Sequence, residues 1–291
     1  MSADTPTGPR VVAIGGGHGL AATLAAAATY STKVTGIVSV ADDGGSSGRL
    51  RDTSGLPALG DLRRALLALA DPGAPLARAM AHRFDSGDLR GHSMGNLLIA
   101  AMVDAEGGLV EALDQIGSLV GSRGRVLPNV VDPVVLCAST MSGERVEGQV
   151  AVMGTPGVDR VWLEPDVTSP AQVVGAIGAA EQIIIGPGSL FTSVLAALVA
   201  PAVRDAVISS GARCIYVSNL RPQVPETLGL DAEGHLAALI RHGIRPDIVL
   251  CDTSAFGGVA PSGNTVLADL CGHGGAVHDP VKLAAALKRL C

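Results

Sequence analysis

The stretch VVAIGGGHGL at residues 11–20 decides the fold of this 291-residue chain. Four apolar residues suited to a short buried strand run into Gly15–Gly19, where only His18 is not glycine, and a helical pattern follows over Leu20–Tyr30. A strand, a glycine loop and a helix in this order are typical of a parallel α/β sheet, in which the loop holds an anion on its backbone N–H groups. Residues 17–22 also form a G-x-G-x-x-A variant of the dinucleotide-binding pattern.

The same alternation of short apolar strands and helical patterns continues along the chain. Further strands are predicted over Val34–Ala41, Gln182–Ile185, Arg213–Val217 and Asp247–Cys251. Helices are predicted over Asp61–Ala70, Asn96–Ala105, Leu109–Val120, Pro170–Ala180, Leu190–Val199, Ala202–Ser210, Ala232–His242 and Pro280–Leu290, with Asp61 and Ser169 as N-caps. Glycine and polar residues follow these strands, at the edge where open α/β sheets bind ligands. We therefore predict a doubly wound, Rossmann-like, mostly parallel sheet with helices on both faces.

The region of about residues 130–165 has a different pattern. Val134–Ser139 and Val146–Val152 resemble a β-hairpin appended to the sheet, and Val158–Leu163 is a candidate third strand. No change of composition along the chain reads as a linker between domains. We expect a single α/β domain over residues 1–291 that carries this small β-hairpin excursion.

Composition excludes several classes of protein. Hydrophobic residues make up 47% of the chain and aromatic residues only 2%, and the net charge of −6 provides no basic footprint for nucleic acid. The five cysteines are odd in number and none has Cys-x-x-Cys spacing, which favours reduced thiols in a cytoplasmic protein. The polar N-terminus does not resemble a signal peptide, and no apolar stretch approaches the ~18 residues of a membrane span.

A polar run, VADDGGSSGRLR at residues 40–51, follows the second predicted strand. Glycines let backbone N–H groups approach an anion, hydroxyls and arginine bind phosphate oxygens, and carboxylates bind sugar hydroxyls or a divalent ion. The candidate ligand residues here are Asp42, Asp43, Gly44, Gly45, Ser46, Ser47 and Arg49. Asp42 and Asp43 could hold a hard ion such as Mg²⁺. The alternative is a solvated Asp-Gly-Gly turn.

Asp42 also stands twenty residues beyond Ala22, where a dinucleotide-binding fold places its ribose-binding acid. Such an acid does not normally open a second loop rich in glycine, serine and arginine, so an NAD-type cofactor remains an alternative. No Gly-Lys-Ser/Thr sequence is present, which excludes a Walker A site.

A second candidate anion site lies after the predicted strand Gln182–Ile185. The sequence GPGSLFTS at residues 186–193 opens a helix there, so backbone donors and three hydroxyls could meet a phosphate. Its candidate ligand residues are Gly186, Pro187, Gly188, Ser189, Thr192 and Ser193. The alternative is a simple turn with Ser189 as a helix cap.

The sequence GHSMG at residues 91–95 matches the G-x-S-x-G nucleophile elbow of α/β-hydrolases, and Asp252 and His278 follow in the required order. An elbow needs a buried strand directly before it, and FDSGDLR at residues 84–90 cannot form one. His92 and Asn96 are instead expected at a helix N-terminus, facing a ligand or a polar junction. Asp61 is a further candidate for ligand contact.

Together these motifs resemble the YvcK branch of the CofD-like family. The stretches that carry the resemblance are GGGHGL at 15–20, VSVADDGGSSGRLR at 38–51, GDLRRALLALA at 60–70, GHSMGNLLIAA at 91–101, RVLPN at 125–129, GPGSLFTSVL at 186–195 and SNLRPQVPETLGL at 218–230. They span roughly residues 11–255. The resemblance implies a Rossmann-like fold that forms a homodimer or a higher homo-oligomer.

The resemblance also implies a function. The enzymatic relatives are phospholactate transferases that use a nucleotide donor and a divalent metal, whereas the YvcK branch binds UDP-sugars, notably UDP-N-acetylglucosamine. That branch is implicated in gluconeogenic growth, cell shape and cell-wall precursor supply, and no catalytic activity is securely attached to it. We expect a cytoplasmic nucleotide-sugar-binding regulator with a possible protein partner. The alternatives are a metal-dependent transferase and an NAD-type dinucleotide-binding protein.

Residue by residue, the resemblance assigns the nucleotide and its diphosphate to two loops. These candidates are Gly15, Gly16, Gly17, His18 and Gly19 in the first loop and residues 186–193 in the second. Asp42 and Asp43 occupy the place of the acidic pair that holds metal in the transferases, and Asn219 and Gln223 would border the ligand. The chain departs from the family pattern at Arg221-Pro222 and at Val277.

Overall fold

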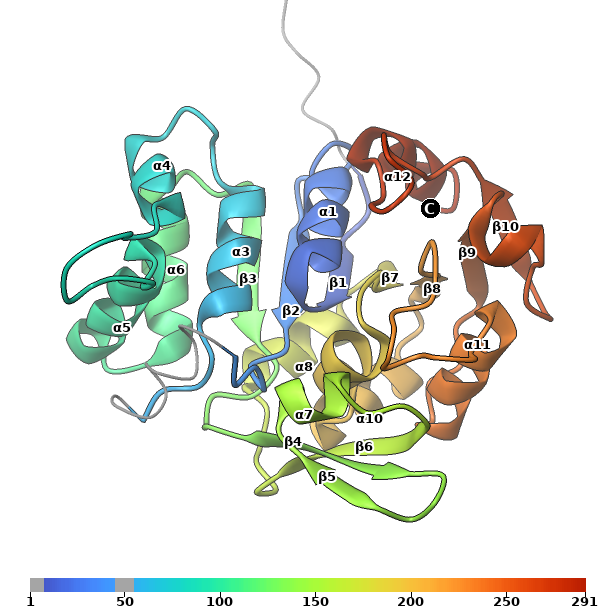
Figure 1. Cartoon of the computed structure of the whole chain (residues 1–291). Coiled ribbons are helices and arrows are strands. Elements are labelled where there is room, and N and C mark those ends of the chain that lie inside the picture. Colours follow the sequence, from blue (N-terminus) through green and yellow to red (C-terminus); the bar gives the residue numbers. More distant parts are fainter. Residues whose placement is uncertain (1–7, 45–54) are drawn as a thin grey trace, which may run out of the picture.

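The computed structural model describes residues 8–44 and 55–291 (Figure 1). The predicted contacts of Gly45, Ser46, Ser47 and Arg49 therefore lie outside the described residues. The main sheet contains β1 Val11–Gly15, β2 Val34–Val38, β3 Gly124–Pro128, β7 Gln182–Ile185, β8 Arg213–Val217, β9 Ile248–Asp252 and β10 Thr265–Ala268. These seven strands lie in the order β10-β9-β8-β7-β1-β2-β3, and every neighbouring pair is parallel. The predicted doubly wound parallel sheet is confirmed.

The order of the strands reverses between β1 and β7. From β1 the chain builds β2 and then β3 on one side, and it later returns to add β7, β8, β9 and β10 on the other side. The loops that leave β1 and β7 must therefore diverge, which leaves a crevice at the carboxyl ends of these two strands. This topological switch point positions the candidate site.

Helices cover both faces of the sheet. They are α1 Gly17–Ala27, α3 Gly60–Leu69, α4 Pro75–Ala81, α5 Met94–Glu106, α6 Leu109–Leu119, α8 Ala171–Gly178, α9 Ala196–Leu198, α10 Pro201–Ser209, α11 Ala232–Arg241 and α12 Pro280–Lys288, with a π-helix η1 at Leu190–Leu195 and a 3₁₀ turn η2 at Ala255–Gly258. Helix α1 packs between α3 and α12 in front of the sheet in Figure 1, and α8 and α10 pack together behind it.

The central strands are buried on both faces, which explains their continuous apolar sequences. Ile14 of β1 and Ile183–Ile185 of β7 are fully buried. With so few aromatic residues, aliphatic side chains fill the core, and Phe191 and Tyr216 are the largest of its fully buried side chains. All five cysteines are free, and Cys137, Cys214 and Cys251 are buried, as expected for reduced thiols.

Residues 130–165 form a second sheet instead of extending the first. Its strands β4 Val135–Thr140, β5 Arg145–Glu147 and β6 Val158–Glu164 are antiparallel in the order β5-β4-β6. The predicted strand Val146–Val152 is wrong beyond Glu147, because helix α7 Gln149–Met153 follows. The N–H group of Val150, in the first turn of this helix, donates to Asp43 Oδ1 at 3.0 Å, a long-range contact that local β-propensity cannot reveal.

Both predicted N-caps are wrong. Helix α3 begins at Gly60 with Leu59 as its cap, so Asp61 lies in the first turn and its carboxylate is used elsewhere. Helix α8 is capped by Pro170 without a side-chain hydrogen bond, and the Ser169 hydroxyl has no partner within the described residues. The strand predicted over Val34–Ala41 ends earlier, at Val38.

Strands β3 and β10, helix α4 and the 3₁₀ turn η2 were not predicted. Strand β3 contains the sequence GRVLP, in which only two adjacent residues are apolar before the proline, and strand β10 is a partly exposed edge strand. Helix α4 has only seven residues. Within residues 8–44 and 55–291, no single helix is long and apolar enough to cross a membrane, although one pair bent by 76°, Leu190–Leu198 with Pro201–Ser209, passes the same test by length and composition.

Candidate functional site

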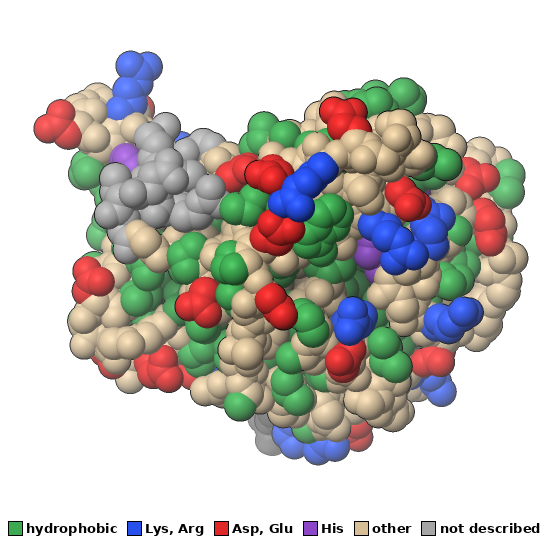
Figure 2. Space-filling model, turned by 90° about the horizontal axis from the view of Figure 1, so that it is seen from below, with side chains coloured by type: hydrophobic (Ala, Val, Ile, Leu, Met, Phe, Trp, Pro, Cys, Tyr) green, Lys and Arg blue, Asp and Glu red, His purple; other side chains and the backbone are tan. Residues whose placement is uncertain are grey.

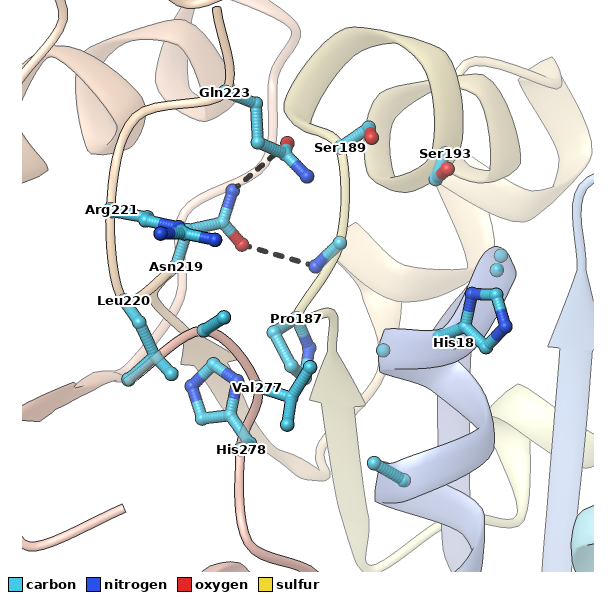
Figure 3. A pocket seen from close by; sticks show the side chains of 16 residues that line it. His18, Pro187, Ser189, Ser193, Asn219, Leu220, Arg221, Gln223, Val277 and His278 are labelled. Carbon is cyan, nitrogen blue, oxygen red and sulfur yellow. Dashed lines mark hydrogen bonds between the residues drawn. The ribbon is translucent and has the colours of Figure 1, made fainter. Parts of the chain in front are cut away.

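A pocket of about 400 Å³ opens at the switch point of the sheet (Figure 3). It is lined by Gly16, Gly17, His18, Gly19, Ala22, Pro187, Gly188, Ser189, Ser193, Asn219, Leu220, Arg221, Gln223, Ala276, Val277 and His278. These residues come from the β1–α1 junction and the start of α1, from the loop after β7 and the π-helix η1, from the loop after β8, and from a loop that precedes α12. Ten of them were predicted from the sequence, and the pocket brings these ten together from three separate motifs.

The first glycine loop turns sharply from β1 into α1. Gly17 has a φ of +67°, a conformation that side chains with a Cβ rarely adopt. At Gly19 a Cβ would collide with the backbone carbonyl of Pro187, so glycine lets the two loops touch. The N–H groups of His18 and Gly19 belong to the first turn of α1, where no intrahelical acceptor exists. They are donors that a ligand at this helix end can use.

Asp61 supports this loop from the neighbouring helix α3. Its Oδ2 accepts the N–H of Gly17 at 2.6 Å, and its Oδ1 pairs with Arg64. A carboxylate is thereby placed at the positive end of the α1 dipole. Asp61 does not line the pocket itself, so the structure places it behind the glycine loop.

The second loop, residues 186–189, is tied to its neighbours on both sides. The buried Thr23 hydroxyl of α1 donates to the carbonyl of Gly186 at 2.8 Å, and the N–H of Gly188 donates to Asn219 Oδ1 at 3.1 Å. Figure 3 shows Ser189 and Ser193 beside this loop, both among the residues that line the pocket. Their hydroxyls are the donors that the loop offers to a ligand.

The carboxylate of Glu226, from the loop after β8, lies at the N-terminus of the π-helix η1. This carboxylate is only 2% exposed, and its Oε1 accepts the N–H groups of Phe191 and Thr192 at 2.7 and 2.9 Å. Burial raises the pKa of Glu226, while the hydrogen bonds from Thr192 and Phe191 oppose the shift. The Thr192 hydroxyl also contacts this carboxylate, so Thr192 lies away from the pocket. Glu226 was not among the residues predicted from the sequence, and its only signal there is its place in SNLRPQVPETLGL at residues 218–230, one of the stretches that carry the family resemblance.

The loop before α12 forms the wall opposite α1. Val277 and His278 point toward Pro187 and Leu220 in Figure 3. Asp252, at the end of β9, accepts the N–H groups of Leu270 and Cys271 at 2.7 and 2.9 Å and so anchors the base of this loop. Burial lowers the pKa of His278 to about 4, so its imidazole is neutral at pH 7. The sequence marked this wall only through Val277, where the chain departs from the family pattern, and predicted no ligand contact there.

The described residues that line the pocket include basic but no acidic side chains. Of its 16 lining residues, all within the described ranges, none is Asp or Glu, and Arg221 is the single Arg or Lys. This composition contrasts with the net charge of −6 of the chain. Figure 2 shows the molecule from below, with acidic and basic side chains interspersed over its surface. The pocket combines backbone, hydroxyl, amide and guanidinium donors and so suits an anion with several acceptor oxygens.

Other predicted residues lie outside the pocket. Gly15 and Gly186 are buried at the ends of their strands. Asp42 Oδ1 accepts the N–H of Gly44 at 2.9 Å, and Asp43 Oδ1 accepts the N–H of Val150 in the first turn of α7. Within the described ranges, no three His, Cys, Asp or Glu residues are grouped as a metal centre. A divalent ion at Asp42 and Asp43 stays a prediction.

The stretch GHSMG also lies away from the pocket. Ser93 is 1% exposed at the start of α5, and the residues before it form a loop that bridges back from Arg83, not a buried strand. Asn96 Oδ1 accepts from Arg63 Nε at 3.1 Å, and neither Asn96 nor His92 lines the pocket. The local structure therefore lacks the strand that a nucleophile elbow requires.

A family model described as "2-phospho-L-lactate transferase CofD" matches residues 11–259. The chain belongs to this family. Within the family it groups with the YvcK-type gluconeogenesis factors. The "Gluconeogenesis factor" of Bacillus subtilis strain 168 is 39% identical to it over 80% of this chain and 75% of that protein. A relative from Deinococcus radiodurans is 42% identical over 97% of this chain, which spans 66% of that relative's length.

Solved structures of relatives share the fold. A crystal structure from Bacillus halodurans, described as a member of the UPF0052 family, superposes with a TM-score of 0.87 at 30% identity. The match covers 96% of this CofD-family chain and 98% of that chain. The pocket described above thus lies in a fold that has also been observed by crystallography.

Proposed function

We propose that this protein binds a nucleotide sugar of the UDP-N-acetylglucosamine type in the pocket at the switch point. As a regulator, it would link central carbon metabolism to cell-wall precursor supply and cell shape. The absence of acidic residues among the 16 described residues that line the pocket carries the proposal, together with Arg221 and the first-turn amides of α1. A diphosphate supplies several acceptor oxygens to such donors.

The transferase alternative rests on the description of the family model. It needs a metal ion that neutralises the charge developing during group transfer. Asp42 and Asp43 are the acids that could hold the ion, yet neither lines the pocket, and each uses one oxygen on a backbone N–H group. This arrangement favours a binding protein over a metal-dependent enzyme.

An NAD-type cofactor is supported less well. A dinucleotide-binding sheet places its ribose-binding acid at the end of the second strand, where it faces the ligand. Asp42 is the residue at that place, and it does not line the pocket. A ligand with a single nucleoside and a sugar therefore fits the lining better than a dinucleotide.

We also propose that residues 1–291 act as one cytoplasmic domain that assembles into a homo-oligomer. One parallel sheet runs from β1 near the start of the chain to β10, and α12 packs back against α1, which supports a single unit. Sedimentation of the purified chain tests the assembly, and a mass that equals the monomer would contradict it.

Thermal unfolding with a ligand panel tests the binding proposal. UDP-N-acetylglucosamine, UDP, GDP and NAD are each added in Mg²⁺ and in EDTA. A ligand that binds only the native state at 100 to 1,000 times its Kd stabilises by about 3–4 kcal/mol, so UDP-N-acetylglucosamine should raise Tm in both buffers. A rise with NAD alone would overturn the proposal. Binding lost in EDTA, with release of UMP or UDP, would favour the transferase.

A further inference from the structure

Two side-chain amides connect the second glycine loop to the loop that follows β8. The N–H of Gly188 donates to Asn219 Oδ1 at 3.1 Å, and Asn219 Nδ2 donates to Gln223 Oε1 at 3.3 Å (Figure 3). All three residues line the pocket. Their two hydrogen bonds form a continuous row along the lining of the pocket.

The direction of this row is fixed by its first member. A backbone N–H can only donate, so the oxygen of the Asn219 amide must face Gly188. The planar amide then turns its NH₂ group toward Gln223, whose oxygen must accept. Since Gln223 Oε1 is engaged, its Nε2 is the group left to meet a ligand. Gln223 is thereby set as a hydrogen-bond donor.

The backbone of Gln223 is held as firmly as its side chain. Its N–H donates to Thr227 Oγ1 at 2.7 Å, and its carbonyl accepts the N–H of Thr227 at 2.7 Å. Glu226, the residue before Thr227, anchors the same turn to the π-helix. Asn219 is only 6% exposed, which limits its own rotation. A donor fixed in this way loses little conformational entropy when it binds a ligand.

We propose that Asn219 is a positioning residue that makes Gln223 a donor, and that Gln223 thereby selects a phosphate oxygen of the ligand. This inference rests on the proposed nucleotide-sugar function. Gln223 shares the pocket with Arg221 and Ser189, which also donate, so the group bound between them must be rich in acceptors. A non-bridging oxygen of the diphosphate meets this requirement.

Calorimetry with UDP-N-acetylglucosamine tests the inference in four proteins: wild type, Gln223→Met, Asn219→Asp and the double variant. Gln223→Met removes the donor with little change in shape, and roughly a 10- to 100-fold loss of affinity is expected for a hydrogen bond to a charged group. Gln172→Met, on the exposed surface of α8, is the matched control and should bind as wild type does.

Asn219→Asp keeps an acceptor for Gly188 but presents a second oxygen to Gln223, which must then turn over and offer Oε1 to the ligand. Asn219→Asp should therefore weaken the binding of UDP-N-acetylglucosamine. The loss of affinity that it causes should be at least ~10-fold larger in the wild-type background than in the Gln223→Met background, where no side-chain amide can turn. The added negative charge is present in both backgrounds and cancels in the comparison.

The outcomes separate the inference from the proposed function. Failure of wild type to bind UDP-N-acetylglucosamine would overturn the proposed function and the inference with it. Binding by wild type with an unchanged Gln223→Met, or an equal cost of Asn219→Asp in both backgrounds, would overturn the inference alone. If Asn219→Asp does not fold, Gln223→Glu decides: it replaces the donor with an acceptor, so it should bind more weakly than Gln223→Met, and tighter binding would refute the inference.

Discussion

Replacing Glu226 probes the connection between the two loops that form the pocket. In Glu226→Ala the N–H groups of Phe191 and Thr192 lose their acceptor inside the protein. A buried donor without a partner costs about 1–3 kcal/mol, so the free energy of unfolding should fall by roughly 3–5 kcal/mol. Glu226→Gln keeps an oxygen for both N–H groups, and it should change stability by no more than about 1 kcal/mol.

The raised pKa of Glu226 gives this pair of variants a pH dependence. Between the unfolded pKa near 4.5 and the higher folded value, the native state binds more protons than the unfolded state. The contribution of Glu226 to stability therefore decreases as the pH rises through that window. Glu226→Gln removes this loss, so it should gain stability relative to wild type as the pH is raised from 4 to 7.

Urea unfolding followed by the fluorescence of Trp162, the single tryptophan, measures these changes. Glu106→Ala and Glu106→Gln, at the exposed end of α5, are matched controls and should unfold at the wild-type midpoint. Equal destabilisation by Glu226→Ala and Glu226→Gln would refute the argument, because it would mean that the retained oxygen does not satisfy the two N–H groups.

Three further predictions concern pH, backbone conformation and metal. Burial lowers the pKa of His235 and of His278 to about 4. Between pH 4 and 6.5 the unfolded state therefore binds more protons than the native state. The free energy of unfolding should fall as the pH is lowered through this window, by up to about 3 kcal/mol for His235. Urea midpoints measured from pH 7 to 4.5 check it, and a flat profile would count against neutral buried imidazoles. Gly17→Val should abolish binding of UDP-N-acetylglucosamine and leave the far-UV circular dichroism spectrum unchanged, because valine disfavours the backbone φ of +67° at this position. Normal binding by this variant would show that the loop is a structural turn without a role in binding. Asp42→Asn and Asp43→Asn should each bind UDP-N-acetylglucosamine equally well in Mg²⁺ and in EDTA. If wild type instead needs the metal for binding and both variants lose this dependence, the result would favour the transferase.

Much of the fold is encoded in local sequence. The apolar runs of β1, β7 and β8 stand next to glycine or polar loops, and both signals lie within a few residues of each other. Strand β10 lacks such a run because it is a partly exposed edge strand. Helix α7 was predicted as a strand because its valines have β-propensity. Its first turn is stabilised by a hydrogen bond that the N–H of Val150 donates to Asp43, more than a hundred residues earlier in the chain.

The residues of the candidate site are likewise of two kinds: some could be found from local sequence, and others are brought to the site only by the fold. The glycine loops and Asn219 could be found from motifs, since tight turns and close approaches require particular residue types. Asp61 and Glu226 could not be assigned from local sequence, because each carboxylate serves backbone N–H groups on a different element, 44 and 35 positions from Gly17 and Phe191 respectively. The wall at Val277 and His278 depends on the folding of the final loop over the sheet edge and has no local signature.

The affinity of UDP-N-acetylglucosamine for wild type and Arg221→Gln, measured by calorimetry, tests the central claim most directly. Arg221 is the single Arg or Lys among the described residues that line the pocket, so its loss should weaken binding of the diphosphate by at least roughly tenfold. Arg204→Gln, on α10, is the matched control and should leave the affinity unchanged. Wild-type affinity in Arg221→Gln, or equal loss in both variants, would contradict the placement of a nucleotide sugar in this pocket.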